Sequence, residues 1–409
     1  MQTTISKIPG GICAPAGFKA AGIHCGIRHN KTKRDLALIV SDTRASAAAL
    51  YTSNLVKGAP IYVTREHLKD GYAQAVIANS GNANTCNRDG LQVARAMADL
   101  AAGALGIPAS DVVVASTGVI GQPLSIEPIA AGIPALVEAL SADGSLEANE
   151  AIMTTDTKTK SESFAFELDG KTCAIGGIAK GSGMIHPNLA TMLVFLTTDV
   201  SITPDLLERA LRADAQDTFN MVSVDGDTST NDTLCILANG RAGNRTLRRE
   251  TDPGYDVFCQ ALHALTSTLC RQISADGEGA TRRMEVTVSG AADKESARRV
   301  AKSVACSSLT KAALFGADAN WGRVLCAIGY AGVPVDIDRV DVDFVSAKGE
   351  IAVCRDGAGV PFSEEKAKEI LLEKEIEIRI RLHDGEAQAT AFGCDLTYEY
   401  VRINGDYRT

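Results

Sequence analysis

The residues with the clearest chemical potential lie at the middle of the chain, in the stretch KGSGMIHPNLATMLVFLTTD from Lys180 to Asp199. Thr191 follows a small residue, Ala190, and precedes an apolar run that needs no threonine to begin a strand. A threonine hydroxyl is a poor nucleophile unless a base lies beside it. A threonine at a chain N-terminus has such a base, because its own α-amine titrates near pH ~8 and accepts protons close to neutrality.

An internal threonine acquires a free amine only if the peptide bond before it is cut. The Thr191 hydroxyl can begin that cut by attacking the Ala190 carbonyl in an N-to-O acyl shift, and alanine obstructs this attack little. Pro187 and the glycines upstream would bend the chain and expose the bond. The alternative is a threonine that merely begins a strand, as threonine commonly does. The Ala-Thr dipeptide taken alone favours that alternative.

The elements that must position these residues alternate between strand-like and helical patterns. A dinucleotide-binding fold is disfavoured, because no βαβ repetition with a G-x-G-x-x-G motif occurs. The mixture predicts an α+β or layered α/β fold, and we place a structural domain boundary near residue 280. The strands are expected at 36–42, 75–79, 112–116, 192–200, 284–290 and 375–382, and the helices at 90–105, 142–156, 204–219, 256–273, 294–307 and 363–374.

Composition narrows the function classes. The formal charge of −9 over 409 residues argues against a nucleic-acid surface, which needs clustered Lys and Arg. No apolar run is long enough to cross a bilayer, and the N-terminus has no signal-peptide pattern. The eleven cysteines are scattered without a C-x-x-C pair, which indicates buried free thiols in a reducing compartment and therefore a cytoplasmic protein. The six histidines lack ligand spacing, so we expect no metal site.

At this point the stretch KGSGMIHPNLATML resembles the self-cleavage segment of a known family. This is the ornithine acetyltransferase family, also described as bifunctional glutamate N-acetyltransferase/amino-acid acetyltransferase of arginine biosynthesis. Each further motif is weak alone, but together and in this order they are highly specific, and the resemblance spans essentially the whole chain. These motifs are GFKAAGIHCGI (17–27), VIANSGNANTC (77–86), ASTGVIGQPL (115–124), MTTDTKTK (153–160), NMVSVDGDTSTND (220–232), DGEGATR (276–282), FGADANWGR (315–323) and NGDYRT (404–409).

The resemblance implies a self-cleaving enzyme that is cut between Ala190 and Thr191. The alpha chain 1–190 and the beta chain 191–409, which begins with the nucleophile Thr191, would assemble as an α2β2 heterotetramer. The implied fold is an αββα arrangement like that of N-terminal-nucleophile enzymes, plus a smaller C-terminal α/β domain. The implied reaction is ping-pong: Thr191 takes the acetyl group from N-acetylornithine and passes it to glutamate. No bound cofactor is implied, although some members also accept acetyl-CoA as a co-substrate.

The resemblance also assigns site residues. The Thr117 hydroxyl and the Gly118 N–H would form the oxyanion hole, where a strand-to-helix turn is the ordinary interpretation. The substrates carry carboxylate and ammonium groups, so residues of both charges are expected. Lys180 would meet a carboxylate and Glu278 an amine, although such residues are more often a solvated loop lysine and a turn acid. The substrate-binding set implied by the resemblance is Thr154, Lys180, Thr191, Glu278, Asn404 and Thr409, the last two in a tail that would otherwise be disordered.

Two other functions stay open at this stage. One is an N-terminal-nucleophile aminopeptidase or amidase, in which water takes the acyl group. The other is an uncut amino-acid-binding or regulatory protein without catalysis. The acceptor of the acyl group separates the first from an acetyltransferase, and one band or two on a denaturing gel separates the second.

Overall fold

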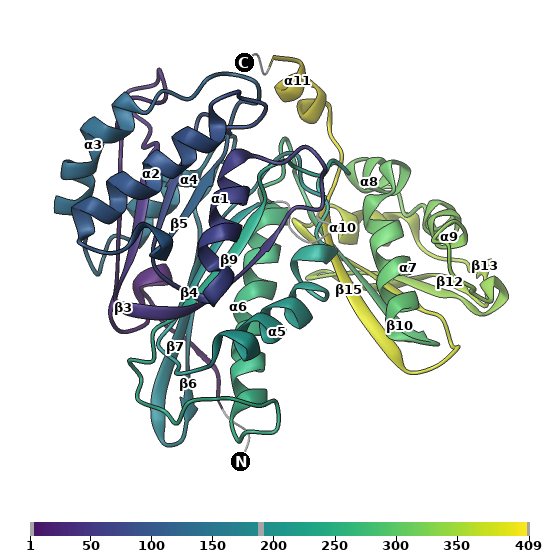
Figure 1. Ribbon diagram of the computed structural model, residues 1–409. Coiled ribbons are helices and arrows are strands. Elements are labelled where there is room, and N and C mark those ends of the chain that lie inside the picture. Colours follow the sequence, from purple (N-terminus) through teal and green to yellow (C-terminus); the bar gives the residue numbers. More distant parts are fainter. Residues whose placement is uncertain (1–3, 187–191, 407–409) are drawn as a thin grey trace.

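A computed structural model of the protein describes residues 4–186 and 192–406, and its strands form two mixed sheets (Figure 1). The first sheet has nine strands in the order β1-β6-β7-β8-β9-β3-β4-β5, with β2 paired to β3. The pairs β4–β5 and β8–β9 are parallel, and the others are antiparallel. The strands are β1 (Ser6–Lys7), β2 (Phe18–Ile23), β3 (Leu36–Tyr51), β4 (Tyr72–Asn79), β5 (Val112–Ser116), β6 (Lys160–Leu168), β7 (Lys171–Lys180), β8 (Leu193–Thr198) and β9 (Thr233–Ala238).

The long strand β3 divides the first sheet into two halves. Its register with β4 shifts between Val40 and Ala45, and its second half pairs instead with β9. Side chains from both halves, among them Ile39 and Phe195, share one buried cluster, so the halves face each other. The outer face of one half is covered by α1 (Ala59–His67), α2 (Gly90–Leu105) and α3 (Glu127–Glu138), and that of the other by α5 (Pro204–Ala215) and α6 (Tyr255–Ala275) (Figure 1). These four layers confirm the predicted αββα arrangement.

Strand β8 shows why an apolar run forms the centre of such a fold. Leu193 and Phe195 lie in the cluster between the sheet halves, whereas Val194 and Leu196 lie in the cluster under α5 and α6. Both faces of the strand are therefore buried, which accounts for an uninterrupted apolar sequence rather than an alternating one.

Two predicted elements have the expected bounds, and the others differ by one or more residues at their ends. Strand β5 and helix α2 begin and end at the predicted residues. The helix predicted at 142–156 is α4 (Ser145–Ile152). It ends because Met153 has extended backbone angles, and because the next N–H, that of Thr154, donates to the side chain of Asp156 instead of a helical carbonyl.

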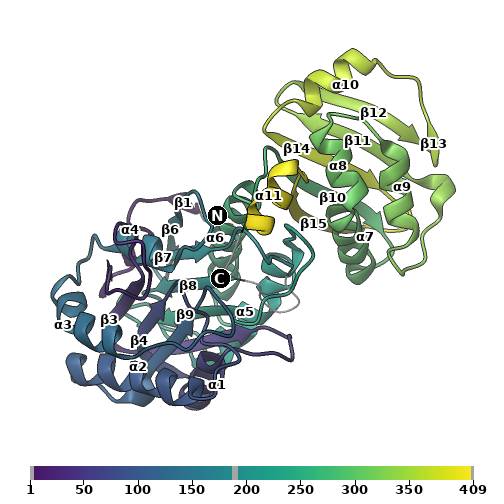
Figure 2. The same cartoon turned by 90° about the horizontal axis from the view of Figure 1, so that it is seen from above.

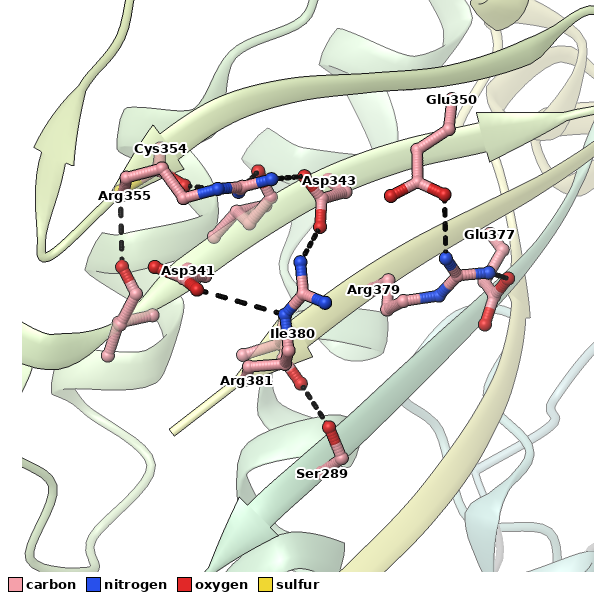
Figure 3. A network of polar contacts seen from close by, with 12 residues as sticks. Ser289, Asp341, Asp343, Glu350, Cys354, Arg355, Glu377, Arg379, Ile380 and Arg381 are labelled. Atoms are coloured by element: carbon pink, nitrogen blue, oxygen red, sulfur yellow. Dashed lines mark hydrogen bonds and ion pairs between the residues drawn. The ribbon is translucent and has the colours of Figure 1, made fainter. Parts of the chain in front are cut away.

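The second sheet follows the first in the chain, in the order β13-β12-β11-β14-β10-β15 (Figure 2). Helices α7 and α10 pack on it, and an open face has alternating Arg, Asp and Glu side chains that form ion pairs between strands (Figure 3). Its elements are β10 (Arg283–Ala291), α7 (Lys294–Cys306), α8 (Ser308–Phe315), α9 (Trp321–Gly329), β11 (Asp341–Ser346), β12 (Gly349–Arg355), β13 (Ala358–Gly359), α10 (Glu364–Leu371), β14 (Glu375–Arg381) and β15 (Ala387–Cys394).

The two sheets share one hydrophobic cluster, which runs from Phe166 of β6 through α6 to Val286 of β10. The boundary expected near residue 280 falls between α6 and β10 in the chain and stays a prediction. The last helix, α11 (Tyr398–Asp406), lies near α6 and the junction of the two sheets (Figure 2).

All eleven cysteines lie in the described part of the chain, and all are free thiols. Six of them are buried as expected, whereas Cys326 is exposed because its position on α9 faces away from the core. Within residues 4–186 and 192–406, no helix combines the length and the apolar character that crossing a membrane requires.

Candidate active site

The end of β5 presents two groups that could stabilise an oxyanion. Thr117 is buried, and its N–H donates to the Asn79 carbonyl (3.0 Å), which continues the pairing of β4 with β5. Gly118 follows with φ of +131°. Among the residues that the structure describes, neither the Gly118 N–H nor the Thr117 hydroxyl has a hydrogen-bond partner. Both donors are therefore available to a ligand.

Gly118 must be a glycine for two reasons. Its φ is one that residues with a side chain rarely adopt, and a Cβ there would lie 2.4 Å from the Gly81 carbonyl carbon and 2.6 Å from the Asn82 nitrogen. The backbone of the strand end thus passes directly against the loop after β4. This close approach fixes the direction of the Gly118 N–H.

Lys180 ends β7 and is buried. Burial lowers the pKa of its ammonium group, against the attraction of the Asp156 carboxylate. In the described ranges this ammonium forms no hydrogen bond and no ion pair. A buried cation without a direct partner is unfavourable unless a ligand supplies the missing anion. Lys180 can therefore receive a carboxylate.

The opposite charge comes from the loop after α6. The Glu278 N–H donates to the Ser182 carbonyl (3.0 Å), and its carboxylate accepts from the Asn404 amide (2.8 Å). A Cβ on Gly183 would lie 2.3 Å from the Glu278 carboxyl carbon, so a side chain at this position would displace the Glu278 carboxylate. Helix α11 thus brings the C-terminal segment back to the pocket at Asn404, where a disordered tail was the alternative.

These residues line one pocket of about 150 Å³, which contains all of the predicted site residues that the structure describes. They come from four strand ends or loops and from α11. Thr191, Ala190 and Thr409 lie outside the described residues. A larger cavity of about 670 Å³ adjoins the pocket and shares Gly118 and Thr154 with it. The predicted residues in the smaller pocket are Thr117, Gly118, Thr154, Lys180, Glu278 and Asn404.

Three further lining residues, Ser229, Thr230 and Asn231, were not among the predicted site residues. The buried Asn231 amide donates to the carbonyls of Ala83 (2.5 Å) and Ser116 (3.0 Å). These bonds connect the turn at Thr117 and Gly118 to the loop before β9. The motif DGDTSTND contained the signal, since its oxygen-rich side chains are suited to lining a polar pocket. The roles of these three residues depend on contacts with distant parts of the chain and could not be predicted from the sequence.

The same loop also contacts the chain on both sides of residues 187–191. On the near side, the Val224 N–H donates to the Ile185 carbonyl (2.7 Å), and the Asp225 carboxylate accepts from Ile185 N–H (2.9 Å). On the far side, the Thr233 N–H donates to the Met192 carbonyl (2.9 Å). Residue 191 is bonded to Met192, and Met192 is anchored beside the first residue of β9.

His186 is a poor candidate for a base. Its Nδ1 lies 3.1 Å from the Ser223 hydroxyl and 3.5 Å from the Cys306 sulfur. Burial, with the nearby Lys302 charge, lowers the pKa of His186 to about 4. It is neutral near pH 7 and weakly basic, which fits a structural residue better than a catalytic base. In the described part of the chain, no cluster of three or more His, Cys, Asp or Glu side chains could hold a metal ion.

The geometry suits acyl transfer better than other chemistry. Two free donors converge at a strand end, and a buried cation and a carboxylate lie across the same pocket. Such donors stabilise the negative oxygen of a tetrahedral intermediate, and the charges orient a substrate that has both an amine and a carboxylate.

Comparison with known proteins identifies the family. The model of the ArgJ family matches residues 19–409. The chain belongs to the ArgJ family. The arginine biosynthesis bifunctional protein ArgJ of Symbiobacterium thermophilum is 51% identical over 407 residues, which cover 98% of this chain and 99% of that protein. The ArgJ protein of Caldanaerobacter subterraneus subsp. tengcongensis is 48% identical over 403 residues, with 98% and 99% covered.

A solved structure agrees with this assignment. The crystal structure of the bifunctional protein ArgJ from Bacillus halodurans is 44% identical, with a TM-score of 0.50. The match covers 98% of that solved chain but 52% of this one. The predicted resemblance and the predicted enzyme class are confirmed by ArgJ membership.

Proposed function

We propose that this ArgJ-family enzyme transfers the acetyl group of N-acetylornithine to glutamate through an acetyl ester on Thr191. The observation that supports this best is the pocket itself. It combines free oxyanion donors with a cation and an anion for an amino-acid substrate, and it lies where the chain approaches Thr191. The nucleophile and the Thr409 contact are part of the proposal, because both residues lie outside the described ranges.

The charges of the pocket fit the two substrates of the exchange. N-acetylornithine has an α-carboxylate and a side-chain ammonium group, and glutamate has an α-amine and two carboxylates. Lys180 would bind a carboxylate and Glu278 an ammonium group, with Thr154 and Asn404 as neutral hydrogen-bond partners. Because both substrates are amino acids, one pocket can serve donor and acceptor in turn, as ping-pong transfer requires.

The reaction would proceed in two matched halves. The Thr191 hydroxyl attacks the acetyl carbonyl while its α-amine takes the hydroxyl proton, and the oxyanion rests on Thr117 and Gly118. The amide C–N bond then breaks, the proton passes to the leaving nitrogen, and ornithine departs. The glutamate α-amine attacks the acetyl ester and loses a proton to the Thr191 amine. The ester C–O bond then breaks, the Thr191 oxygen takes this proton back, and N-acetylglutamate leaves.

Self-cleavage between Ala190 and Thr191 would create the free amine. One feature supports the cleavage itself, and another supports the association of the two fragments afterwards. The Bacillus halodurans chain is covered almost whole by about half of this one, and residues 191–409 make up about 54% of the sequence. The fragments would also stay together, because β8 pairs with β7 and β9 pairs with β3 along six residues each.

We also propose an α2β2 assembly in the cytoplasm, without a bound cofactor and with acetyl-CoA as a second donor. The description of the relatives as bifunctional supports a second activity. The cavity of about 670 Å³ reaches Gly118, so the large leaving group of acetyl-CoA would lie there. Sedimentation of the purified protein tests the assembly, and release of free thiol from acetyl-CoA in the presence of glutamate tests the donor.

Replacement of the nucleophile tests the central claim. Thr191→Ala removes the cleavage hydroxyl and the acyl carrier, so the chain should stay whole and inactive. Thr191→Ser keeps a hydroxyl and should retain both cleavage and activity in part. Denaturing electrophoresis and N-terminal sequencing of the smaller fragments report the cut. Turnover like that of the wild type in Thr191→Ala would overturn the proposal.

The fate of the acetyl group tests the reaction class. With N-acetylornithine and millimolar glutamate, the expected product is N-acetylglutamate in an amount equal to the ornithine released. Acetate in place of N-acetylglutamate would indicate an amidase, in which water takes the acyl group.

A further inference from the structure

A buried lysine that is not among the predicted site residues connects three of the chain segments that line the pocket. Lys160, the first residue of β6, is 1% exposed and is the largest of the fully buried side chains. Its ammonium group lies 2.7 Å from Asp156 Oδ1 and 2.6 Å from Asp276 Oδ2. Both carboxylates are buried as well. Lysine is almost never fully buried unless it is paired, so this cluster needs an explanation.

Each carboxylate also accepts hydrogen bonds from backbone that leads into the pocket. Asp156 Oδ2 accepts from the Thr154 N–H (2.9 Å), and Asp156 Oδ1 from the Gly181 N–H (2.7 Å), directly after Lys180. The first bond holds the loop after α4. The second holds the end of β7. One side chain thus sets the spacing between Thr154 and Lys180.

Asp276 makes the corresponding link to the third loop. Its carboxylate accepts from the Thr157 N–H (3.0 Å), and its carbonyl accepts from the Ser182 hydroxyl (2.6 Å). The Ser182 carbonyl in turn accepts from the Glu278 N–H (3.0 Å). The position of the Glu278 carboxylate relative to the end of β7 therefore depends on Asp276.

The cluster also affects the charge in the pocket. One ammonium with two carboxylates leaves a net charge of −1 beside Lys180. Burial opposes ionisation of Asp156, but the Lys160 and Lys180 ammonium groups outweigh it and hold the pKa of Asp156 well below its usual range. Lys180 thus gains a compensating charge without a direct ion pair, and its N–H groups stay available.

We infer that Lys160, Asp156 and Asp276 form a positioning cluster. The cluster sets the distances between the three groups that bind the amino-acid substrate: the Lys180 ammonium, the Glu278 carboxylate and the Thr154 hydroxyl. The inference rests on the proposed function, since it names what holds that function's binding groups. Lys160 itself touches no substrate in this scheme. It acts through the Asp156 carboxylate on Thr154 and Lys180. It acts on Glu278 by holding Asp276, whose backbone carbonyl accepts from Ser182.

A role in stability alone is the competing explanation, and the second sheet provides a matched control. Asp343 of β11 is fully buried and pairs with Arg355 and with Arg381 (Figure 3). Like Asp276 it is a buried carboxylate paired with a cation, but its two arginine partners lie on the open face of the second sheet. Removing its charge should affect folding without moving the pocket.

The test compares Asp276→Asn and Lys160→Met with Asp343→Asn. In Asp276→Asn the negative charge opposite the Lys160 ammonium is lost at nearly constant volume. We expect KM for N-acetylornithine and for glutamate to rise at least tenfold in both cluster variants, with a smaller fall in kcat. In Asp343→Asn both KM values should stay within twofold of wild type, even if its thermal midpoint falls equally.

Two results would overturn the inference. One is a KM within twofold of wild type in a folded cluster variant, and the other is an equal rise in KM in Asp343→Asn. If neither buried variant folds, Thr157→Val decides, because Thr157 is exposed and its hydroxyl donates to the Asp276 carboxylate. It should raise KM about threefold, and no rise would overturn the inference. If the wild type transfers no acetyl group, the proposed function fails, while calorimetric binding of N-acetylornithine to the same variants still tests the cluster.

Discussion

The close packing of Gly118 against the loop after β4 yields a quantitative prediction for Gly118→Ala. The new Cβ would lie 2.4 Å from the Gly81 carbonyl carbon, whereas ordinary contacts begin at 3.4 Å. The strand end and the loop after β4 must then separate by about 1 Å, since neither atom belongs to a flexible side chain. The N–H of residue 118 would move with its backbone, away from the oxygen it should bind.

The expected loss follows from that displacement. Removing one oxyanion donor lowers kcat by about 10²–10³, and a 1 Å misplacement of a catalytic group costs about 10². We therefore expect kcat to fall about 100-fold, which corresponds to about 2.7 kcal/mol in the activation free energy. The φ of +131° adds strain of about 1–3 kcal/mol to the folded state, so the thermal midpoint should fall as well.

Gly121→Ala is the matched control on the same loop. Gly121 has φ of +80°, and a Cβ there would meet nothing within 4 Å. This variant has backbone strain without displacement of the oxyanion turn, and its kcat should stay within threefold of wild type. Initial rates of N-acetylglutamate formation at saturating substrate provide kcat, divided by the amount of cleaved chain so that slow self-cleavage is not counted as slow transfer. A folded, cleaved Gly118→Ala with kcat within threefold of wild type would refute the assignment of this donor.

Three further predictions concern single groups of the pocket. Thr117→Val removes the hydroxyl at similar volume and should lower kcat about 10²-fold, whereas Thr117→Ser should stay close to wild type; equal rates in the two variants would exclude the hydroxyl from catalysis. Because burial lowers the pKa of Lys180, its ammonium deprotonates below the ordinary value of about 10.4. KM for glutamate should therefore rise as the pH increases through that lowered pKa. A pH profile of KM that Lys180→Met leaves unaltered would contradict this prediction. Glu278→Gln should raise KM for N-acetylornithine by about 10-fold or more, since a charge-assisted hydrogen bond contributes roughly 1.5–3 kcal/mol, and an unchanged KM would remove Glu278 from substrate binding.

The parts of the fold that local pattern determines could be predicted from the sequence. Helix α2 has its apolar periodicity and a Gly106 in the left-handed conformation at its end, and β5 is a short β-branched run, so both match their predicted bounds. The length of β3 could not be predicted, because its second half, TRASAAALY, alternates poorly and pairs with β9, about 190 residues later in the chain. Non-local pairing of this kind leaves little local signal.

The site residues also divide into those that local motifs indicate and those that depend on non-local contacts. Gly118 and Lys180 could be named because they lie inside motifs of the family that the sequence resembles, although the glycine-rich sequence around Lys180 indicated a loop and the structure places it at the end of β7. Lys160 could not, although it lies in the quoted motif MTTDTKTK. Lysine in a threonine-rich segment predicts a solvated loop, and only the partner Asp276, more than 100 residues away, makes its burial favourable. Asn231 was missed for the same reason, since its two acceptors, the carbonyls of Ala83 and Ser116, lie more than 100 residues earlier in the chain.

The distribution of the pocket residues along the chain has a consequence for the cut. Thr117, Gly118 and Lys180 precede Thr191, whereas Glu278 and Asn404 follow it, so neither fragment alone contains a complete pocket. Cleavage at the centre of the sheet can then activate the enzyme only if the fragments stay paired. The ladders of β8 with β7 and of β9 with β3 meet that requirement, because both faces of β8 are buried and separating the fragments would expose two hydrophobic clusters. If the backbone is cut as proposed, the same buried strand that stabilises the fold would keep Thr117 and Gly118 of one fragment against the Glu278 carboxylate of the other.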